Sequence, residues 1–289
     1  MQDTPIKGTI NDVSDTSFWV AYYRAKENER PDAIFKDPFA KKLVGERGKD
    51  IAESMPAISR YAEWTVVSRT VMIDRMIEKS IADGVEAVIN LGAGLDARPY
   101  RMNLPASLLW IEVDYPNIIK HKTEILKSDS PKCKLQRFEV DLANDQKRRE
   151  FLKNIVPESK KVLIITEGVI PYLDLNQVSR LGQDLLDQKR FVFWIIEYFN
   201  PRVYQYLKNT VRAVKMKNAP FKFYPPDWFE FFKNVGWVAK DLRFSVDIAT
   251  EFKRKLPMPM IGKIIFLFMS QQKREKASRM AGYVLMERA

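Results

Sequence analysis

Short apolar runs separated by polar, helix-compatible stretches fill the middle of the chain. This alternation is typical of strands and helices that build a mostly parallel, doubly wound α/β sheet. The apolar runs predict strands over residues 87–91, 108–113, 135–140, 161–166, 190–197, 237–245 and 282–288. The stretches between the first five strands predict helices over residues 98–103, 116–127, 145–154 and 175–188.

The two flanks of this region have other patterns. Before it, apolar residues recur at helical spacing over residues 11–26 and 58–82. Between these two helices, Asp37-Pro38 supplies the cap and the first residue of a short helix. After the alternating region, an aromatic and basic stretch leads to a helix that ends near Gly236, and residues 246–281 form a basic insertion between the last two strands.

These patterns predict one domain with three parts. They are an N-terminal helical extension over residues 1–83, the α/β core over residues 84–198, and a C-terminal part over residues 199–289 with lid insertions and the last two strands of the core sheet.

Composition limits the class of protein. The chain has 289 residues, of which 46% are hydrophobic, enough for a sizeable core. Its one cysteine, Cys133, excludes an internal disulfide framework and a thiolate metal cluster, and we expect no metal site. The first twenty residues are polar, and the longest apolar run, residues 264–269, is far shorter than the roughly 20 residues of a membrane span. A cytoplasmic protein is expected.

The net charge of +11 comes entirely from residues 200–289, which contain 18 basic and 7 acidic residues. Such a region can steer an anionic substrate toward an entrance. Because no recognition motif accompanies the charge, we expect no nucleic-acid partner. Residues 252–269 combine a basic cluster with an apolar run, which predicts a lid over an apolar pocket or a weak membrane-surface contact.

Acidic residues stand at or just past the ends of four apolar runs. The first run opens into the glycine turn 90–98, which contains Asp96, and the next three are followed by Asp114, Asp141 and Glu167. The carboxyl ends of parallel strands meet at one crevice, where ligands bind. A crevice with several carboxylates favours a ligand with positive charges and hydroxyl groups, and S-adenosylmethionine has a sulfonium, an ammonium and a ribose diol.

The same turn is also compatible with a dinucleotide. Gly92, Gly94 and Ala97 satisfy the looser G-x-G-x-x-A fingerprint, and Asp114 follows Gly94 by the 20 residues expected of a ribose-binding acid. However, Asp96 stands where the helix would receive a pyrophosphate, and a carboxylate there repels it. The charges therefore favour S-adenosylmethionine. An NAD(P)-dependent oxidoreductase and a cofactor-binding protein without turnover remain open alternatives.

Six segments resemble the leucine carboxyl methyltransferase family, including its bacterial and archaeal branch of O-methyltransferases, in the family's order over about residues 15–200. The segments are Asp37-Pro38-Phe39-Ala40, Ser68-Arg69-Thr70 with Asp74, Asn90–Arg98 with Tyr100-Arg101, Glu112–Pro116, Asp141-Leu142 and Glu167–Leu173. The resemblance implies a Rossmann-like class I methyltransferase fold with an antiparallel C-terminal strand. It also implies methyl transfer from S-adenosylmethionine to oxygen, with S-adenosylhomocysteine as product.

The resemblance also implies roles for single residues. Arg69 would hold the methionyl carboxylate, Asp114 the ribose diol, and Glu167 would lie near the methionyl ammonium and the sulfonium. Asp141 and Leu142 would flank the adenine. The implied cofactor-binding set is Arg69, Gly92, Ala93, Gly94, Asp96, Arg98, Asp114, Tyr115, Asp141, Leu142 and Glu167, and the implied catalytic residues are Glu167 and Tyr172.

At two positions this sequence departs from the family, or does not show which of its residues takes the family's role. The family often has threonine where Ala97 stands, so one hydrogen bond of the turn is expected to be missing. The family also uses an N-terminal basic residue, for which Arg24 and Lys26 are both candidates.

The nature of the methyl acceptor follows from the available bases. A carboxylate is already ionised at neutral pH and needs no general base, whereas a hydroxyl group does. The only histidine, His121, lies between two lysines of a helix, where we expect it to be solvated. We therefore favour a carboxylate of an anionic or apolar small molecule or peptide. Candidate substrate contacts are Arg24, Tyr198, Asn200, Tyr204 and Tyr224. The sequence does not determine the acceptor or the oligomeric state.

Overall fold

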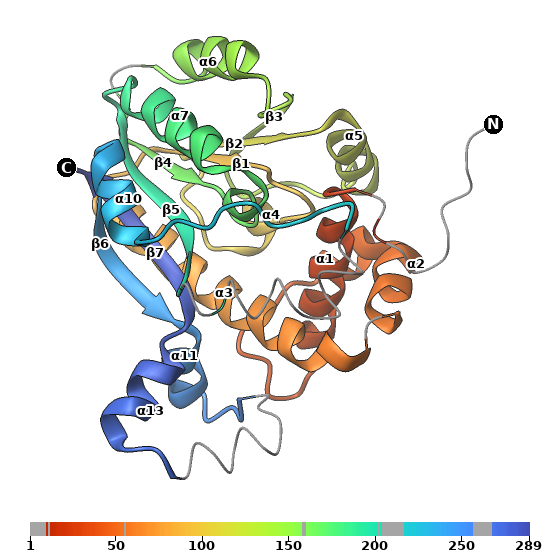
Figure 1. Ribbon diagram of the computed structural model, residues 1–289. Coiled ribbons are helices and arrows are strands. Elements are labelled where there is room, and N and C mark those ends of the chain that lie inside the picture. The colour runs from red at the N-terminus through yellow and green to blue at the C-terminus, as the bar shows by residue number, and fades with distance from the viewer. Residues whose placement is uncertain are drawn as a thin grey trace.

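The computed structural model describes residues 10, 12–54, 56–157, 160–200, 203, 217–256 and 268–289, with the backbone alone at 56–60 and 274–277. One seven-stranded sheet with the order β3-β2-β1-β4-β5-β7-β6 forms its centre (Figure 1). The strands are β1 (Ala87–Leu91), β2 (Leu109–Asp114), β3 (Lys134–Glu139), β4 (Val162–Ile165), β5 (Phe191–Phe199), β6 (Trp237–Phe244) and β7 (Ala281–Arg288).

The first five strands are parallel and β7 is antiparallel to both of its neighbours. The strand order reverses between β1 and β4, since one half of the sheet runs outward through β2 and the other through β5. Ligands of open α/β sheets bind outside the carboxyl ends of the strands at such a reversal. All seven predicted strands are confirmed, with ends that differ by one or two residues.

Helices cover both faces of the sheet. On one face, α6 (Asp145–Asn154), α7 (Leu175–Leu186) and α10 (Trp228–Val235) bury Leu152, Leu181 and Phe232 against the strands. On the other face, α3 (Pro56–Ala82) and α11 (Ser245–Glu251) bury residues that include Met76 and Ile248. Both central strands β1 and β4 are fully buried, which explains why β4 is wholly apolar and β1 is apolar except at Asn90.

Five further helices and one 3₁₀ turn complete the described part of the chain. They are α1 (Asp15–Asn28), α2 (Ala40–Glu53), α4 (Arg98–Arg101), α5 (Pro116–Ile125), the 3₁₀ turn η1 (Ile170–Tyr172) and α13 (Gln271–Ser278). In Figure 1, α1 and α2 lie side by side next to α3, in agreement with the contacts between α1 and both helices.

Two expectations about helices need correction. The helix predicted over residues 98–103 has only four residues. The helix expected to have Asp37 as its cap and Pro38 as its first residue begins at Ala40 with Phe39 at the N-cap position, although Asp37 Oδ1 still accepts a hydrogen bond from Ala40 N at 3.0 Å. It is also not short, because α2 has 14 residues with a non-helical Gly45 inside it. The basic insertion predicted between the last two strands does lie between β6 and β7, and it contains α11, whose Ile248 and Ala249 are buried.

None of the helices in the described part is long and apolar enough to cross a membrane. Most of the segment predicted as a lid or membrane contact, residues 257–267, lies outside the described residues.

One buried ion pair fixes α5 against the sheet. Lys122 of α5 and Glu112 of β2 are both fully buried, with Nζ 2.6 Å from Oε1. The other oxygen of Glu112 receives Arg137 Nε of β3 at 2.8 Å. Because a buried charge is costly without its partner, this pair ties the helix to one position on the strand.

Replacing Lys122 by methionine tests this constraint. Lys122→Met leaves Glu112 in the interior with one cation instead of two, so we expect the free energy of unfolding to fall by about 3–5 kcal/mol. Chemical denaturation measures the change. Lys127→Met is the matched control, because Lys127 pairs with Glu124 at the surface. Equal stability of the two variants would contradict the assignment.

Candidate functional site

A cavity of about 1570 Å³ opens at the carboxyl ends of β1, β2, β4 and β5. Its walls come from the strand ends, from α1 and α3, and from residues 221–222, 253–256 and 280–283 of the C-terminal part. Segments far apart in sequence therefore enclose one space at the reversal of the strand order.

The glycine turn brings backbone to the cavity wall. Gly92 and Gly94 have φ values of +73° and +49°, a region that disfavours residues with a side chain. A Cβ atom at Gly92 would collide with Val169, and one at Gly94 would lie 3.1 Å from the Cβ atom of Ser17. Both glycines are thus required by the close approach of the β1 turn to its neighbours.

Asp114 holds this turn from the end of β2. Its Oδ2 accepts a hydrogen bond from Gly94 N at 2.6 Å, and its Oδ1 accepts one from Tyr115 N at 2.7 Å. Burial raises the pKa of Asp114, although both amides favour the ionised form. Tyr115 lines the rim of the cavity with 41% of its surface exposed. A carboxylate fixed in this way can accept hydrogen bonds from a diol through its remaining lone pairs.

Only one of the two residues expected to flank the adenine lies in the cavity wall. Leu142 lines the cavity, together with the adjacent Ala143. Asp141 is exposed, is not among the lining residues, and its Oδ1 accepts a hydrogen bond from Ala143 N at 2.9 Å. Its place in the structure supports a local turn rather than a direct ligand contact.

Glu167 follows β4 and is held between two arginines. Arg69 Nε of α3 lies 2.8 Å from its Oε1, and Arg98 Nη1 of α4 lies 2.7 Å from its Oε2. Burial opposes the charge, but the two guanidinium groups outweigh it and hold the pKa of Glu167 below its usual value. This pairing explains how an apolar strand can end in a buried carboxylate.

Arg98 connects Glu167 to the other acids of the glycine turn. It is fully buried behind the cavity wall, with Nη1 2.8 Å from Asp96 Oδ2 and Nε 2.7 Å from Asp74 Oδ1. It is not among the residues that line the cavity, so the structure gives it a positioning role instead of a direct ligand contact. Burial opposes ionisation of Asp96 too, yet Arg98 and Arg24 keep its pKa well below the usual range.

The structure distinguishes the two N-terminal basic candidates. Arg24 of α1 lines the cavity, donates a hydrogen bond to the carbonyl oxygen of Leu95, and lies 3.3 Å from Asp37. Lys26 is not in the wall and pairs with Glu63 at 2.7 Å. Arg24 is therefore the residue that joins the N-terminal extension to the glycine turn.

Most of the predicted substrate contacts lie elsewhere. Tyr198 packs against Trp228 at a centroid distance of 5.4 Å, and neither it nor Asn200 and Tyr224 is a lining residue. Tyr204 lies outside the described residues. Of the members of this set that the structure describes, only Arg24 is in the wall. The implied catalytic residue Tyr172 also lines the cavity and packs against Phe221.

His121 lies outside the cavity but is not the solvated residue that the sequence predicted. Its Nε2 lies 3.0 Å from the carbonyl oxygen of Leu43, and its ring packs against Phe18. It serves the packing of α5 against the N-terminal helices.

The sequence analysis missed Glu197, a buried acid of the cavity wall. It lies on β5 with 4% of its surface exposed, and its Oε1 accepts a hydrogen bond from Gly168 N. Burial raises its pKa to about 7. Glu197 stands near the end of an apolar run, so the rule that selected Asp114 and Glu167 could have found it.

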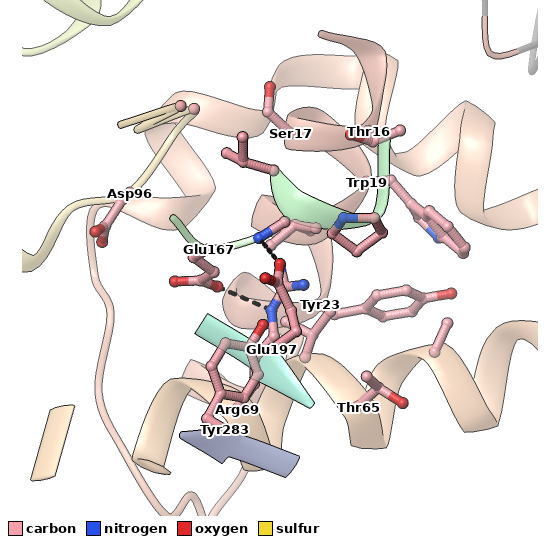
Figure 2. A pocket seen from close by; sticks show the side chains of 18 of the residues that line it. Thr16, Ser17, Trp19, Tyr23, Thr65, Arg69, Asp96, Glu167, Glu197 and Tyr283 are labelled. Atoms are coloured by element: carbon pink, nitrogen blue, oxygen red, sulfur yellow. Dashed lines mark hydrogen bonds and ion pairs between the residues drawn. The ribbon is translucent and has the colours of Figure 1, made fainter. Parts of the chain in front are cut away.

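The cavity has a charged end and an aromatic end. Figure 2 shows Asp96 and Glu167 on one side, Trp19 and Tyr23 of α1 on the other, and Glu197 between them in this view. The aromatic end provides an apolar wall, whereas the charged end offers fixed carboxylates beside the glycine turn.

These features define a class of protein. A sheet of this order with an antiparallel β7, and a carboxylate-lined cavity beside a glycine turn, belong to the class I methyltransferases that use S-adenosylmethionine. Asp114, the glycine turn and Leu142 suit the nucleoside, because they offer hydrogen-bond acceptors, close backbone approach and an apolar surface.

Comparison with known proteins identifies the family. The model of the leucine carboxyl methyltransferase family matches residues 17–185, more than half of the chain. The chain therefore belongs to this family, and it is an S-adenosylmethionine-dependent methyltransferase. This assignment removes the nicotinamide-dependent oxidoreductase from the alternatives.

Two curated relatives agree, both named "Putative S-adenosyl-L-methionine-dependent methyltransferase". The Mycobacteroides abscessus protein is 30% identical over 60% of this chain and 61% of its own length. The Parafrankia protein is 26% identical over 88% of this chain and 86% of its own length.

Solved structures support the fold. A "duf574 family protein" of Streptomyces avermitilis superposes with a TM-score of 0.59 at 12% identity, covering 95% of this chain and 97% of that one. A "putative methyltransferase" of Thermobifida fusca gives a TM-score of 0.52 at 14% identity, covering 98% and 95%.

Replacing Asp114 tests the nucleoside end of the cavity. Asp114→Ala removes an acceptor for the diol and the hold on Gly94, so we expect affinity for S-adenosylmethionine and S-adenosylhomocysteine to fall by at least about tenfold. Calorimetry measures both ligands. Asp129→Ala is the control, because Asp129 pairs with Lys42 outside the cavity. Unchanged affinity in Asp114→Ala would remove this residue from the site.

The raised pKa of Glu197 predicts how stability depends on pH in the ligand-free protein. The folded protein, with a pKa of about 7 against an ordinary 4.5, binds this proton more tightly than the unfolded chain does. Stability is therefore lost as pH rises from about 4.5 through 7. Between pH 5 and pH 8 the wild type should lose on the order of 1–3 kcal/mol more of its free energy of unfolding than Glu197→Gln does, because the variant lacks the titrating carboxyl group. Thermal unfolding at both values measures the difference, and parallel pH profiles would contradict it.

Proposed function

We propose that this methyltransferase transfers its methyl group to a carboxylate oxygen of an acceptor with an apolar body. The observation that carries the proposal is the charge of the cavity rim. Lys222, Lys253 and Lys255 are exposed members of the wall, and no ion pair joins them to a described carboxylate. The acids of the rim are already paired, Asp32 with Arg30 and Glu63 with Lys26. The opening is therefore positive and favours entry of an anion.

The interior of the cavity supports an acceptor with an apolar body. Trp19 and Tyr23 are buried residues of its wall, and Tyr172 with Phe221 adds a further aromatic surface. Such walls exclude water and bind apolar groups without the help of a charged side chain. An anion at the charged end and an apolar body at the aromatic end would fill both parts of the space.

The residues of the chain act by placement and charge. When bound, S-adenosylmethionine supplies a methyl group on a sulfonium: an anionic oxygen can attack the methyl carbon in line with the carbon–sulfur bond, and S-adenosylhomocysteine leaves. Asp114 and the glycine turn would hold the nucleoside, and Arg69 with Glu167 would fix the methionyl end. A carboxylate acceptor brings its own negative charge, so the site needs no proton acceptor for the transfer.

The stability of the methylated product in base tests the proposal. Incubation of the protein with methyl-labelled S-adenosylmethionine and a panel of aromatic and long-chain carboxylic acids and phenols should label the acids. The products should lose their label as methanol in mild base, because esters hydrolyse and ethers do not.

A variant of the rim gives a second readout. Lys253→Gln with Lys255→Gln should raise the KM of the labelled acid several-fold, weaken the effect of salt on kcat/KM, and leave cofactor affinity unchanged. Lys127→Gln is the control, because Lys127 is not a lining residue and pairs with Glu124 at the surface. Base-stable label on phenols would overturn the carboxylate assignment, and absence of turnover with bound cofactor would favour a binding protein.

A further inference from the structure

Glu197 lines the cavity that has a charged and an aromatic end. In Figure 2 it stands between Glu167, on the charged side, and Tyr23, on the aromatic side. All three residues line the same cavity. A methyl group carried at the charged end and an acceptor bound at the aromatic end would meet near this position.

The two oxygens of Glu197 have different surroundings. Oε1 accepts the amide hydrogen of Gly168, which fixes the side chain. Oε2 is buried and has no hydrogen-bond partner within the described part of the chain. Because a buried polar atom without a partner is costly, a ligand in the cavity that formed a hydrogen bond with this oxygen would be stabilised.

Charged and titratable groups surround Glu197 from each element packed on it. They are Arg69 of α3, Glu167 after β4 and Tyr283 of β7, and behind them Arg98 of α4 is paired with Glu167. Arg69 favours the ionised form of Glu197 and Glu167 opposes it.

The charges of the buried network already balance without Glu197. Its ion pairs join four arginines to four carboxylates, namely Arg24, Arg69, Arg98 and Arg101 with Asp37, Asp74, Asp96 and Glu167. The arginines of the network therefore leave no positive charge to neutralise the carboxyl group of Glu197. A ligand that brings one positive charge favours its ionised form, and one that brings a negative charge favours its protonated form.

We propose that Glu197 contacts the methyl acceptor and changes its protonation state during each cycle. Its carboxylate faces the sulfonium while the acceptor is absent. It takes one proton from solvent when the acceptor carboxylate enters and then donates a hydrogen bond to the acceptor oxygen that is not methylated. The acceptor half of this cycle rests on the proposed function.

The transfer itself neither consumes nor releases the proton of Glu197. A bond forms between the acceptor oxygen and the methyl carbon, the bond from that carbon to sulfur breaks, and its electron pair remains on sulfur. The next sulfonium returns the proton of Glu197 to solvent. The pKa of Glu197, raised by burial to about 7, places both forms within reach of such ligand charges near neutral pH.

The cofactor half can be tested without an acceptor. Calorimetry of S-adenosylmethionine and S-adenosylhomocysteine binding, in buffers of different ionisation enthalpy, counts the protons released. Near pH 7 the wild type should release on the order of half a proton more with the sulfonium ligand. Between pH 6 and 8 its preference for that ligand should rise by about tenfold.

Glu197→Gln should bind both ligands and lose this contribution to proton release and to pH dependence. Glu287→Gln is the matched control, because Glu287 lies on the neighbouring strand β7 and pairs with Lys240 outside the cavity. The control should behave as the wild type. Equal proton release in Glu197→Gln and the wild type would overturn the proposal for Glu197. If the wild type bound neither ligand, the assigned cofactor would fail instead.

Carbon-13 NMR of glutamate-labelled wild-type protein answers the same question should Glu197→Gln fail to fold. A carboxyl resonance with a titration midpoint near pH 7 would support the proposal if S-adenosylmethionine lowers that midpoint more than S-adenosylhomocysteine does. The absence of any carboxyl group that titrates between pH 6 and 8 would overturn it.

Discussion

The buried guanidinium of Arg98 is the interaction on which the site depends. It contacts Asp74 of the long helix α3, Asp96 of the glycine turn and Glu167 after β4. Each of these carboxylates would be costly in the interior without a partner. Displacing one of them would also leave the buried charge of Arg98 less well paired. One side chain therefore fixes three segments that are far apart in sequence.

This constraint explains how the cavity can be both acidic and stable. Arg69 and Arg24 extend the network to the cavity wall, so that Glu167 and Asp96 stay ionised despite their burial. The carboxylates present a fixed, preorganised field to a cationic nucleoside, and water need not reorganise when the ligand binds. Glu197 differs because no arginine of the described residues forms an ion pair with it, and we propose that the ligands set its charge.

Separation of charge along the cavity suits a cationic cofactor in one region and the proposed anionic acceptor in another. Paired carboxylates lie at the strand ends, whereas lysines without described partners lie at the rim and aromatic side chains line the interior between α1 and η1. A cationic cofactor and an anionic, partly apolar acceptor are complementary to these two regions. The N-terminal helix α1 contributes to both, since it carries Arg24 beside the glycine turn and Trp19 in the aromatic wall.

The sequence by itself determined the seven strands, most of the helices and the class of ligand, because strand and helix periods and the acids at strand ends are local features. It did not reveal that Arg98 stands behind the wall, that Arg24 and not Lys26 reaches the cavity, or that Tyr198 packs against Trp228 away from it. The direction in which a side chain points depends on helix rotation and on contacts between distant segments. Tertiary structure alone therefore decided which charges pair with one another and which, such as the carboxyl group of Glu197, remain for a ligand.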